Sequence, residues 1–199
     1  MVGPLDLVLA SASPRRRELL SSLGWRFRTD AADVCEELLD GELPRDAVVR
    51  LARAKAGDAV RRNPGSVVIA ADTLVSLDGN VLGKPSGRDE SFRMISLLSG
   101  RTHSVFTGIA VRRGGEERFA VEETRVVFRH LSPEAAMAYV DSGEGDDKAG
   151  AYAIQGRGAL LVSSIEGDYF NVVGLPLRGL SGLLEEFGCS LAEQWRNAR

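Results

Sequence analysis

The sequence predicts an α/β fold: a single domain over residues 1–199 with a mixed, mostly elongated β-sheet flanked by helices. Apolar runs typical of strands alternate with segments of helical period in the first half of the chain. Two long strand-like runs then follow each other around Gly114-Gly115, a turn that joins antiparallel neighbours, so a purely parallel sheet is disfavoured. No linker, repeat or low-complexity stretch divides the chain, which is long enough for one substantial core.

The order of the elements follows from turn and cap residues. Strands are expected where β-branched and other apolar residues run between Gly, Pro, Asn and Asp, and helices where apolar residues recur every three or four positions. Proline at a first helical position and glycine just past a last one mark helix ends, as Pro14 and Gly24 do around the first helix. In chain order we expect strand 5–10, helix 14–23, strand 25–29, helix 44–62, strands 67–77 and 81–82, helix 89–98, strands 103–113 and 118–129, helix 132–143, strands 159–165 and 170–173, and helix 177–187.

Composition restricts the class of protein. With 44% hydrophobic and 27% charged residues, the chain has the make-up of a soluble globular protein. Its net charge of −3 argues against nucleic acid as a partner, whereas local arginine clusters suit a small anion. Cys35 and Cys189 lie far apart in no metal-like spacing, which fits a reducing compartment. Neither a leader nor a membrane-length apolar run is evident, so we expect a cytoplasmic protein without a membrane partner.

The segment 7–20 is the most informative part of the chain. An apolar run leads into a turn and a helix start that carry two hydroxyls, a proline and guanidinium groups: Ser11, Ser13, Pro14, Arg15 and Arg16. Ser13 suits the N-cap, and a helix N-terminus directs free N–H groups and its positive dipole to the same spot. That spot lies at the carboxyl end of a strand, where open α/β sheets bind ligands, and it predicts a phosphate or polyphosphate site. The alternative is a capped surface helix with solvated arginines.

Two charged residues fall in apolar surroundings. Lys55 lies on the core-facing stripe of the helix 44–62, so its ammonium must either snorkel to solvent or meet an anion. Asp72 lies inside the apolar strand 67–77, where a carboxylate is costly unless it is paired, for example with an arginine, or binds a metal ion or acts as a general base.

Two loop residues are further candidates. The stretch 79–85 resembles a phosphate-binding P-loop, but three residues rather than four separate its glycines, and Pro85 replaces the Ser or Thr that would bind magnesium. Lys84 therefore either points from a hairpin toward phosphates or is an exposed loop lysine. Gln155 lies near glycines that allow a ligand to approach closely, and its amide could read a base edge, although a surface turn is the alternative. His103 and His130 fit neither a catalytic triad nor a zinc helix and are expected to be structural.

Short blocks along the chain carry a resemblance. The segment Ser11-Ala12-Ser13-Pro14-Arg15-Arg16 is followed, in order, by blocks at 71–73, 83–85, 98–103, 147–152, 154–156 and 171–176. Together they resemble the Maf family of nucleoside triphosphate pyrophosphatases. The resemblance implies a Maf/ITPase-like fold and hydrolysis of a nucleoside triphosphate to the monophosphate and pyrophosphate. The blocks at 147–152 and 154–156 resemble the branch that acts on dTTP, UTP and modified pyrimidine nucleotides. Two alternatives remain: the sister branch specific for 7-methyl-GTP, and a non-catalytic nucleotide-binding regulator of cell division.

The resemblance also implies roles for individual residues. Asp72 is the proton acceptor of the reaction, and Glu36 joins it in holding a divalent metal cation, Mg²⁺ or Mn²⁺, with Glu37 as the neighbouring alternative. Arg15, Thr73 and Gln155 determine which base is accepted. Residues expected to bind the substrate are Ser11, Ser13, Arg15, Arg16, Lys55 and Lys84. A homodimer is a further expectation from the family.

Overall fold

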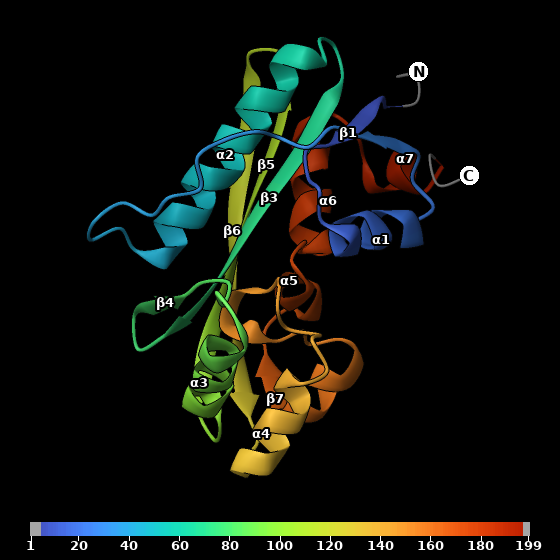
Figure 1. Cartoon of the computed structure of the whole chain (residues 1–199). Helices are drawn as coiled ribbons and strands as arrows, with labels where there is room; N and C mark the ends of the chain where they lie inside the picture. The colour runs from blue at the N-terminus through green and yellow to red at the C-terminus, as the bar shows by residue number, and fades with distance from the viewer. Residues whose placement is uncertain (1–4, 197–199) are drawn as a thin grey trace.

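The computed structural model describes residues 5–196 and has a seven-stranded mixed sheet (Figure 1). The strands are β1 (Leu7–Leu9), β2 (Phe27–Thr29), β3 (Val67–Leu77), β4 (Asn80–Leu82), β5 (Thr102–Arg113), β6 (Glu116–Phe128) and β7 (Val162–Glu166). The helices are α1 (Pro14–Ser22), α2 (Pro44–Arg62), α3 (Arg88–Leu98), α4 (Pro133–Val140), α5 (Tyr169–Val173), α6 (Leu177–Glu186) and α7 (Leu191–Arg196), with 3₁₀ turns η1 (Ala149–Ala151) and η2 (Gly156–Leu161).

The three long strands β3, β5 and β6 pair antiparallel at the centre of the sheet. Its order is β2-β1-β3-β5-β6-β7, and β4 pairs with the far end of β3 as a hairpin. β1 and β2 are parallel to their neighbours, whereas β5, β6 and β7 are antiparallel, so the predicted mixed sheet is confirmed. In Figure 1 these strands run from an upper group of elements, with β1, α1, α2 and α6, to a lower group with β4, α3, α4 and β7. Each end of a long strand therefore belongs to a different part of the same domain.

The two faces of the sheet are covered by different helices, as the strand period of two requires. Ile69 and Ala71 of β3 belong to the larger core cluster, which also contains residues of α1, α3, α4 and α6. Val68 and Ala70, on the opposite face, pack with small residues of α2. The small side chains let α2 approach the sheet closely, which sets the depth of the site described below.

One glycine fixes how closely α2 approaches the sheet. Gly108 of β5 pairs with Asp72 of β3 in the ladder. A Cβ atom on Gly108 would lie 2.3 Å from the carbonyl oxygen of Val48 in α2, far inside contact distance. The α2 backbone therefore rests directly on the β5 backbone beside Asp72.

Two predicted strand segments are wrong and one helix was not anticipated. Residues 170–173 belong to helix α5, because the Asp168 carboxylate accepts the N–H of Phe170 at 2.7 Å and Gly174, with φ of 117°, ends the helix. These cap residues outweigh the β-branched run between them. Residues 159–161 belong to η2, so β7 begins at Val162, and α7 was not predicted. Among residues 5–196, none of the helices is both long and apolar enough to cross a membrane.

Candidate active site

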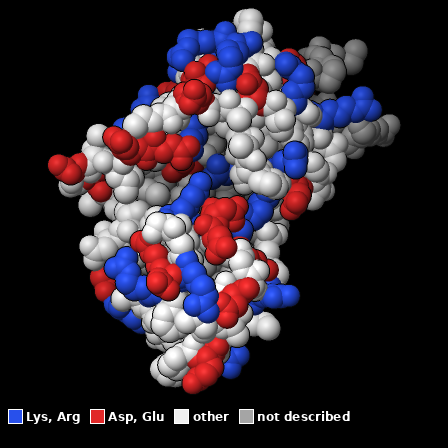
Figure 2. Space-filling view, viewed as in Figure 1, with Lys and Arg blue, Asp and Glu red and all other residues white. Residues whose placement is uncertain are grey.

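A cavity of about 540 Å³ opens between the upper and lower groups of elements. In Figure 2, basic side chains gather in the hollow that crosses the middle of this face, with acidic side chains at its margins. The cavity lies past the carboxyl end of β1, as the phosphate-site hypothesis requires. Nine of the ten predicted site residues line it: Ser11, Ser13, Arg15, Arg16, Glu36, Lys55, Asp72, Thr73 and Lys84.

Gln155 is the predicted residue that the structure does not bring into the cavity wall. Its neighbour Ile154 lines the cavity, and Gln155 itself stands at the N-cap of η2 and is half-buried. Its role in base recognition stays a prediction.

Lys55 joins two carboxylates at one wall of the cavity. Its side chain is 10% exposed, and its Nζ lies 2.6 Å from Oδ1 of Asp72 and 2.9 Å from Oε1 of Glu36. The lysine therefore meets anions rather than snorkelling, and the partner of Asp72 is a lysine rather than an arginine. Glu37 does not line the cavity, and its backbone carbonyl accepts a hydrogen bond from Arg50, so Glu36 rather than Glu37 is the glutamate that joins Asp72 in the cavity.

The charges around Glu36 act on its ionisation. Burial alone would raise the pKa of this carboxyl group. The hydrogen bond and charge of Lys55, helped by Lys84 and Arg16, more than offset that effect and hold the pKa of Glu36 below its usual value. The carboxylate is thus kept in its charged form at one edge of a basic cavity.

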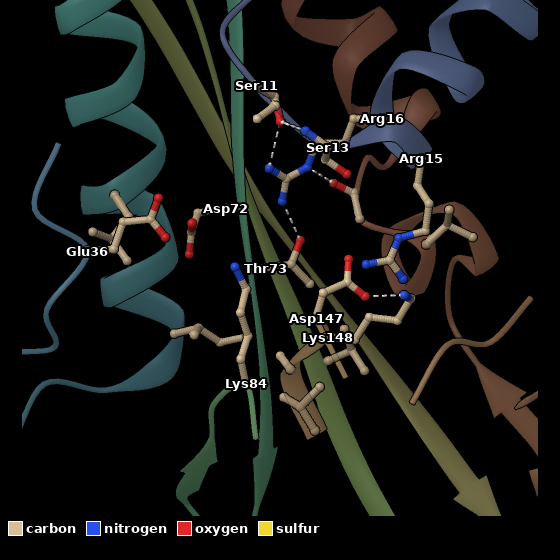
Figure 3. Close-up of a pocket in the computed structure, with 18 of the residues that line it drawn as sticks. Ser11, Ser13, Arg15, Arg16, Glu36, Asp72, Thr73, Lys84, Asp147 and Lys148 are labelled. Carbon is tan, nitrogen blue, oxygen red and sulfur yellow. Dashed lines mark hydrogen bonds and ion pairs between the residues drawn. The ribbon is translucent and has the colours of Figure 1, made fainter. Parts of the chain in front are cut away.

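The Arg16 guanidinium is bonded almost completely to the protein. Its Nε donates to the carbonyl oxygen of Gly174 at 2.8 Å, and its Nη1 donates to the Ala71 carbonyl at 2.8 Å. Further bonds reach Ser11 Oγ at 3.3 Å and Thr73 Oγ1 at 3.0 Å (Figure 3). Arg16 therefore ties the β1–α1 turn, the middle of β3 and the end of α5 together, a structural role that the sequence did not reveal.

Unlike Arg16, the side chains of Arg15 and Lys84 are not bonded to the protein residues that the structure describes. Within residues 5–196, neither guanidinium nor ammonium makes a hydrogen bond or ion pair, and both side chains point into the cavity in Figure 3. Burial lowers the pKa of Arg15, with the charge of Asp147 as the main opposing influence. These two cations are free to donate hydrogen bonds to the oxygen atoms of an anionic ligand.

The predicted helix cap at the β1–α1 turn differs in detail. Ser13 stands at the N-cap of α1, with Pro14 at the first helical position, but its side chain makes no capping hydrogen bond. Instead, its backbone N–H donates to Ser11 Oγ at 3.2 Å. The Ser13 hydroxyl is thus left on the cavity wall at the start of the helix, where an anion would be stabilised.

Several residues of the cavity were not singled out as site residues from the sequence. Asp147 and Lys148 face Arg15 from the segment before η1. Tyr152 also lines the cavity, and its hydroxyl lies 2.8 Å from Nε2 of the buried His103. Burial lowers the pKa of His103 to about 4, so this imidazole is neutral near pH 7, in line with its expected structural role. In the sequence, Asp147 and Lys148 stood out only as members of the family block 147–152, and nothing in that block pointed to their contact with each other in the cavity.

The acidic pair fits a metal ion that is shared with phosphate. In the part of the chain that the structure describes, no group of three or more His, Cys, Asp or Glu side chains could form an all-protein cage. Mg²⁺ in nucleotide enzymes is typically held by one or two carboxylates together with substrate phosphate oxygens. Asp72 and Glu36 converge on one ammonium and supply hard oxygen ligands, so the donor set suits this mode.

Comparisons with known proteins agree on a family. The family model described as Maf-like protein matches residues 6–187. A dTTP/UTP pyrophosphatase of Symbiobacterium thermophilum is 51% identical over 183 residues, covering 92% of this chain and 94% of that protein. One from Myxococcus xanthus is 52% identical over 190 residues, covering 96% and 95%, and one from Thermococcus onnurineus is 52% identical over 171 residues, covering 86% and 92%.

Solved structures with partial likeness include the Staphylococcus aureus Ham1 protein, with 14% identity and a TM-score of 0.47 over 92% of this chain and 97% of that one. The protein VC0702 from Vibrio cholerae has 14% identity and a TM-score of 0.36 over 70% of this chain and 75% of that one. The match to the family model spans most of the chain, and about half of the residues are identical to those of full-length relatives. The chain therefore belongs to the Maf family.

Proposed function

We propose that the protein hydrolyses dTTP, UTP and modified pyrimidine nucleoside triphosphates to the monophosphate and pyrophosphate. The observation that carries this proposal is the cavity itself, which brings Arg15 and Lys84, both unpaired among residues 5–196, together with the carboxylates of Asp72 and Glu36. Such a site can neutralise a triphosphate on one side and activate water on the other. The names of the relatives from S. thermophilum and M. xanthus, dTTP/UTP pyrophosphatase, support the same activity.

The basic residues divide the task of binding the phosphates. Arg15 and Lys84 have free donors and would contact the triphosphate directly. Arg16 and Lys55 add positive charge from positions fixed by their own hydrogen bonds. Ser11 and Ser13 line the turn where the first helix begins, so their hydroxyls and the helix dipole favour the same anion.

Asp72 is the proposed proton acceptor. A water oxygen forms a bond to the α-phosphorus while the bond from that phosphorus to the α–β bridging oxygen breaks. The bonding electron pair leaves with pyrophosphate, and the water proton passes to a carboxylate oxygen of Asp72. Glu36 and Asp72 would hold Mg²⁺ or Mn²⁺, which when bound supplies charge neutralisation for the phosphates. Lys55 keeps both carboxylates oriented toward the cavity.

Base selection is assigned to Arg15, Thr73 and Gln155. The hydroxyl of Thr73 is bonded to Arg16 at 3.0 Å and to Thr107 at 2.9 Å, so it is held rigidly at the cavity wall. A thymine or uracil edge presents carbonyl acceptors around an N–H donor, which the amide of Gln155 can match. The cytoplasmic location and the homodimer stay predictions.

The test is pyrophosphate release from a panel of dTTP, UTP, CTP, GTP and 7-methyl-GTP, with Mg²⁺ or Mn²⁺ and again with EDTA. We expect dTTP and UTP to be preferred, with pyrophosphate and monophosphate as products and no turnover in EDTA. A preference for 7-methyl-GTP would instead assign the protein to the sister branch. Nucleotide binding without any pyrophosphate release would favour the non-catalytic regulator.

A further inference from the structure

Lys148 is a half-buried cation whose bonded partner is an exposed carboxylate next to it in sequence. Its side chain is only 15% exposed and lines the cavity, whereas the side chain of Asp147 is 75% exposed. The Lys148 ammonium is bonded to the Asp147 carboxylate, as the dashed line in Figure 3 marks. Throughout residues 5–196, the Lys148 side chain makes no other hydrogen bond or ion pair.

Asp147 faces a second cation as well. Arg15 projects from α1 toward this pair in Figure 3, and the charge of Asp147 is the main influence that opposes the effect of burial on the pKa of Arg15. The hydrogen bond from Lys148, and more weakly the charge of Arg15, lower the pKa of Asp147. A single surface carboxylate thus balances two cations that line the cavity of about 540 Å³.

The backbone fixes Lys148 relative to Lys84. The N–H of Gly150 donates to the carbonyl oxygen of Gly83 at 3.0 Å, directly before Lys84 in the chain. Gly150 has φ of 71°, and a Cβ atom there would lie 3.1 Å from Cγ1 of Val75, so the segment is packed tightly against β3. The Lys148 side chain therefore starts from a rigid position on the same wall as Lys84.

We propose that Lys148 is a further phosphate-binding residue and that Asp147 is a resident counter-anion, bonded to Lys148 and offsetting the charge of Arg15 without contacting it, when the cavity is empty. The inference rests on the proposed function and extends it to product release. Because the Asp147 side chain is largely exposed, solvent screens its bond to Lys148 and the pair contributes little, so an anion with several charges displaces the Asp147 carboxylate easily. The same carboxylate competes with bound pyrophosphate and so weakens the binding of the product.

The test is pyrophosphate affinity, measured by titration calorimetry on the full-length protein with two substitutions at neighbouring positions. Lys148→Met should raise the Kd for pyrophosphate about tenfold, because a charge-assisted contact is lost. Asp147→Asn should lower the same Kd by roughly threefold to tenfold, because the competing charge is removed. Arg93→Met, on the 76%-exposed Arg93 of α3 that pairs with Glu90, is the matched control and should leave the Kd unchanged.

Opposite shifts at adjacent residues distinguish this inference from a structural ion pair. A structural pair predicts a lower Tm for both variants and the same Kd as the wild type, which would overturn the proposal. Shifts of the same sign would also overturn it. Because Asp147 is largely exposed, Asp147→Asn decides the matter even if Lys148→Met fails to fold. Absence of turnover in the wild type would contradict the proposed function, whereas unchanged pyrophosphate affinity in the variants of an active enzyme would contradict only this inference.

Discussion

Arg15 and Arg16 are adjacent, yet the structure predicts different consequences of losing each one. Arg16→Ala removes the donor to two backbone carbonyls, those of Ala71 and Gly174. Each carbonyl left unpaired costs about 1–3 kcal/mol, so we expect the free energy of unfolding to fall by roughly 2–6 kcal/mol. In a chain of this size that corresponds to a decrease in Tm of roughly 5–20 °C.

Arg15→Ala is the matched comparison. Its guanidinium makes no hydrogen bond with any residue that the structure describes, so its loss should change the free energy of unfolding by no more than about 0.5 kcal/mol. It should instead lower kcat/KM for dTTP by roughly 30- to 150-fold, because about 2–3 kcal/mol of charge-assisted binding disappears.

The assay is urea and thermal unfolding followed by circular dichroism, together with steady-state kinetics on the folded fraction. Arg16→Lys serves as a charge control, since an ammonium cannot reach all four acceptors of a planar guanidinium. Equal Tm values for Arg15→Ala and Arg16→Ala would refute the structural role of Arg16. Near-normal turnover in Arg15→Ala would refute the assignment of Arg15 to the phosphates.

Three further predictions address the reaction, the base and pH. The Asp72→Asn variant should still bind nucleotide, but its metal-dependent hydrolysis should be slower by a factor of about 10²–10⁴. The control variant Asp141→Asn, which removes a carboxylate from a surface pair with Arg88, should be fully active. If Asp72→Asn retains its activity but has a lower Tm, Asp72 is purely structural. Gln155→Ala should reduce the preference for dTTP over GTP by roughly 5- to 150-fold with the chemical step intact, and an unchanged substrate ranking in kcat/KM would remove Gln155 from base recognition. Because the pKa of His103 is lowered from 6.5 to about 4 in the folded state, the unfolded chain binds more protons between these values. The stability from the neutral imidazole is therefore fully present above pH 6.5 and is lost as pH falls toward 4, by on the order of 3 kcal/mol. His103→Phe should flatten this part of a stability–pH curve, and an equal slope in the variant would contradict the assignment.

Local signals predicted the elements that position the site. Pro44 and the Asn63-Pro64-Gly65 stop delimit α2, and the apolar run around Asp72 delimits β3, so both elements were predicted with their observed bounds. The residues that cap α5, Asp168 and Gly174, are also local signals, but the β-branched residues between them led to the prediction of a strand. Sequence patterns of this kind describe neighbours along the chain and little beyond.

The partners of the cavity residues depend on distant segments. The acceptors of Arg16 lie 55 and 158 residues away, at Ala71 and Gly174, and although both positions fall in family blocks, no periodicity or spacing indicates that they meet Arg16. Lys148 was noticed in the sequence only as part of a family block, and its burial against the wall that carries Lys84 became evident from the fold. The sequence therefore identified which side chains have the right chemistry, whereas the division into bonded and free cations required the three-dimensional structure.

The close contact at Gly108 makes the spacing between α2 and the sheet a determinant of reactivity. The α2 backbone lies directly against the β5 backbone, so the distance between the α2 and β5 main chains fixes how far Lys55 is from Asp72. If that main-chain distance increased, rearranging side chains could not bring it back to its original value. A methyl group at position 108 would lie about 0.7 Å inside the 3.0 Å limit for real Cβ contacts and would lift the helix by a similar distance. The same displacement would follow from enlarging Ala52 or Ala56 on the helix side. Substitutions that fill this interface would thus shift Lys55 relative to Asp72, the proposed proton acceptor, although the substituted residues lie outside the cavity wall.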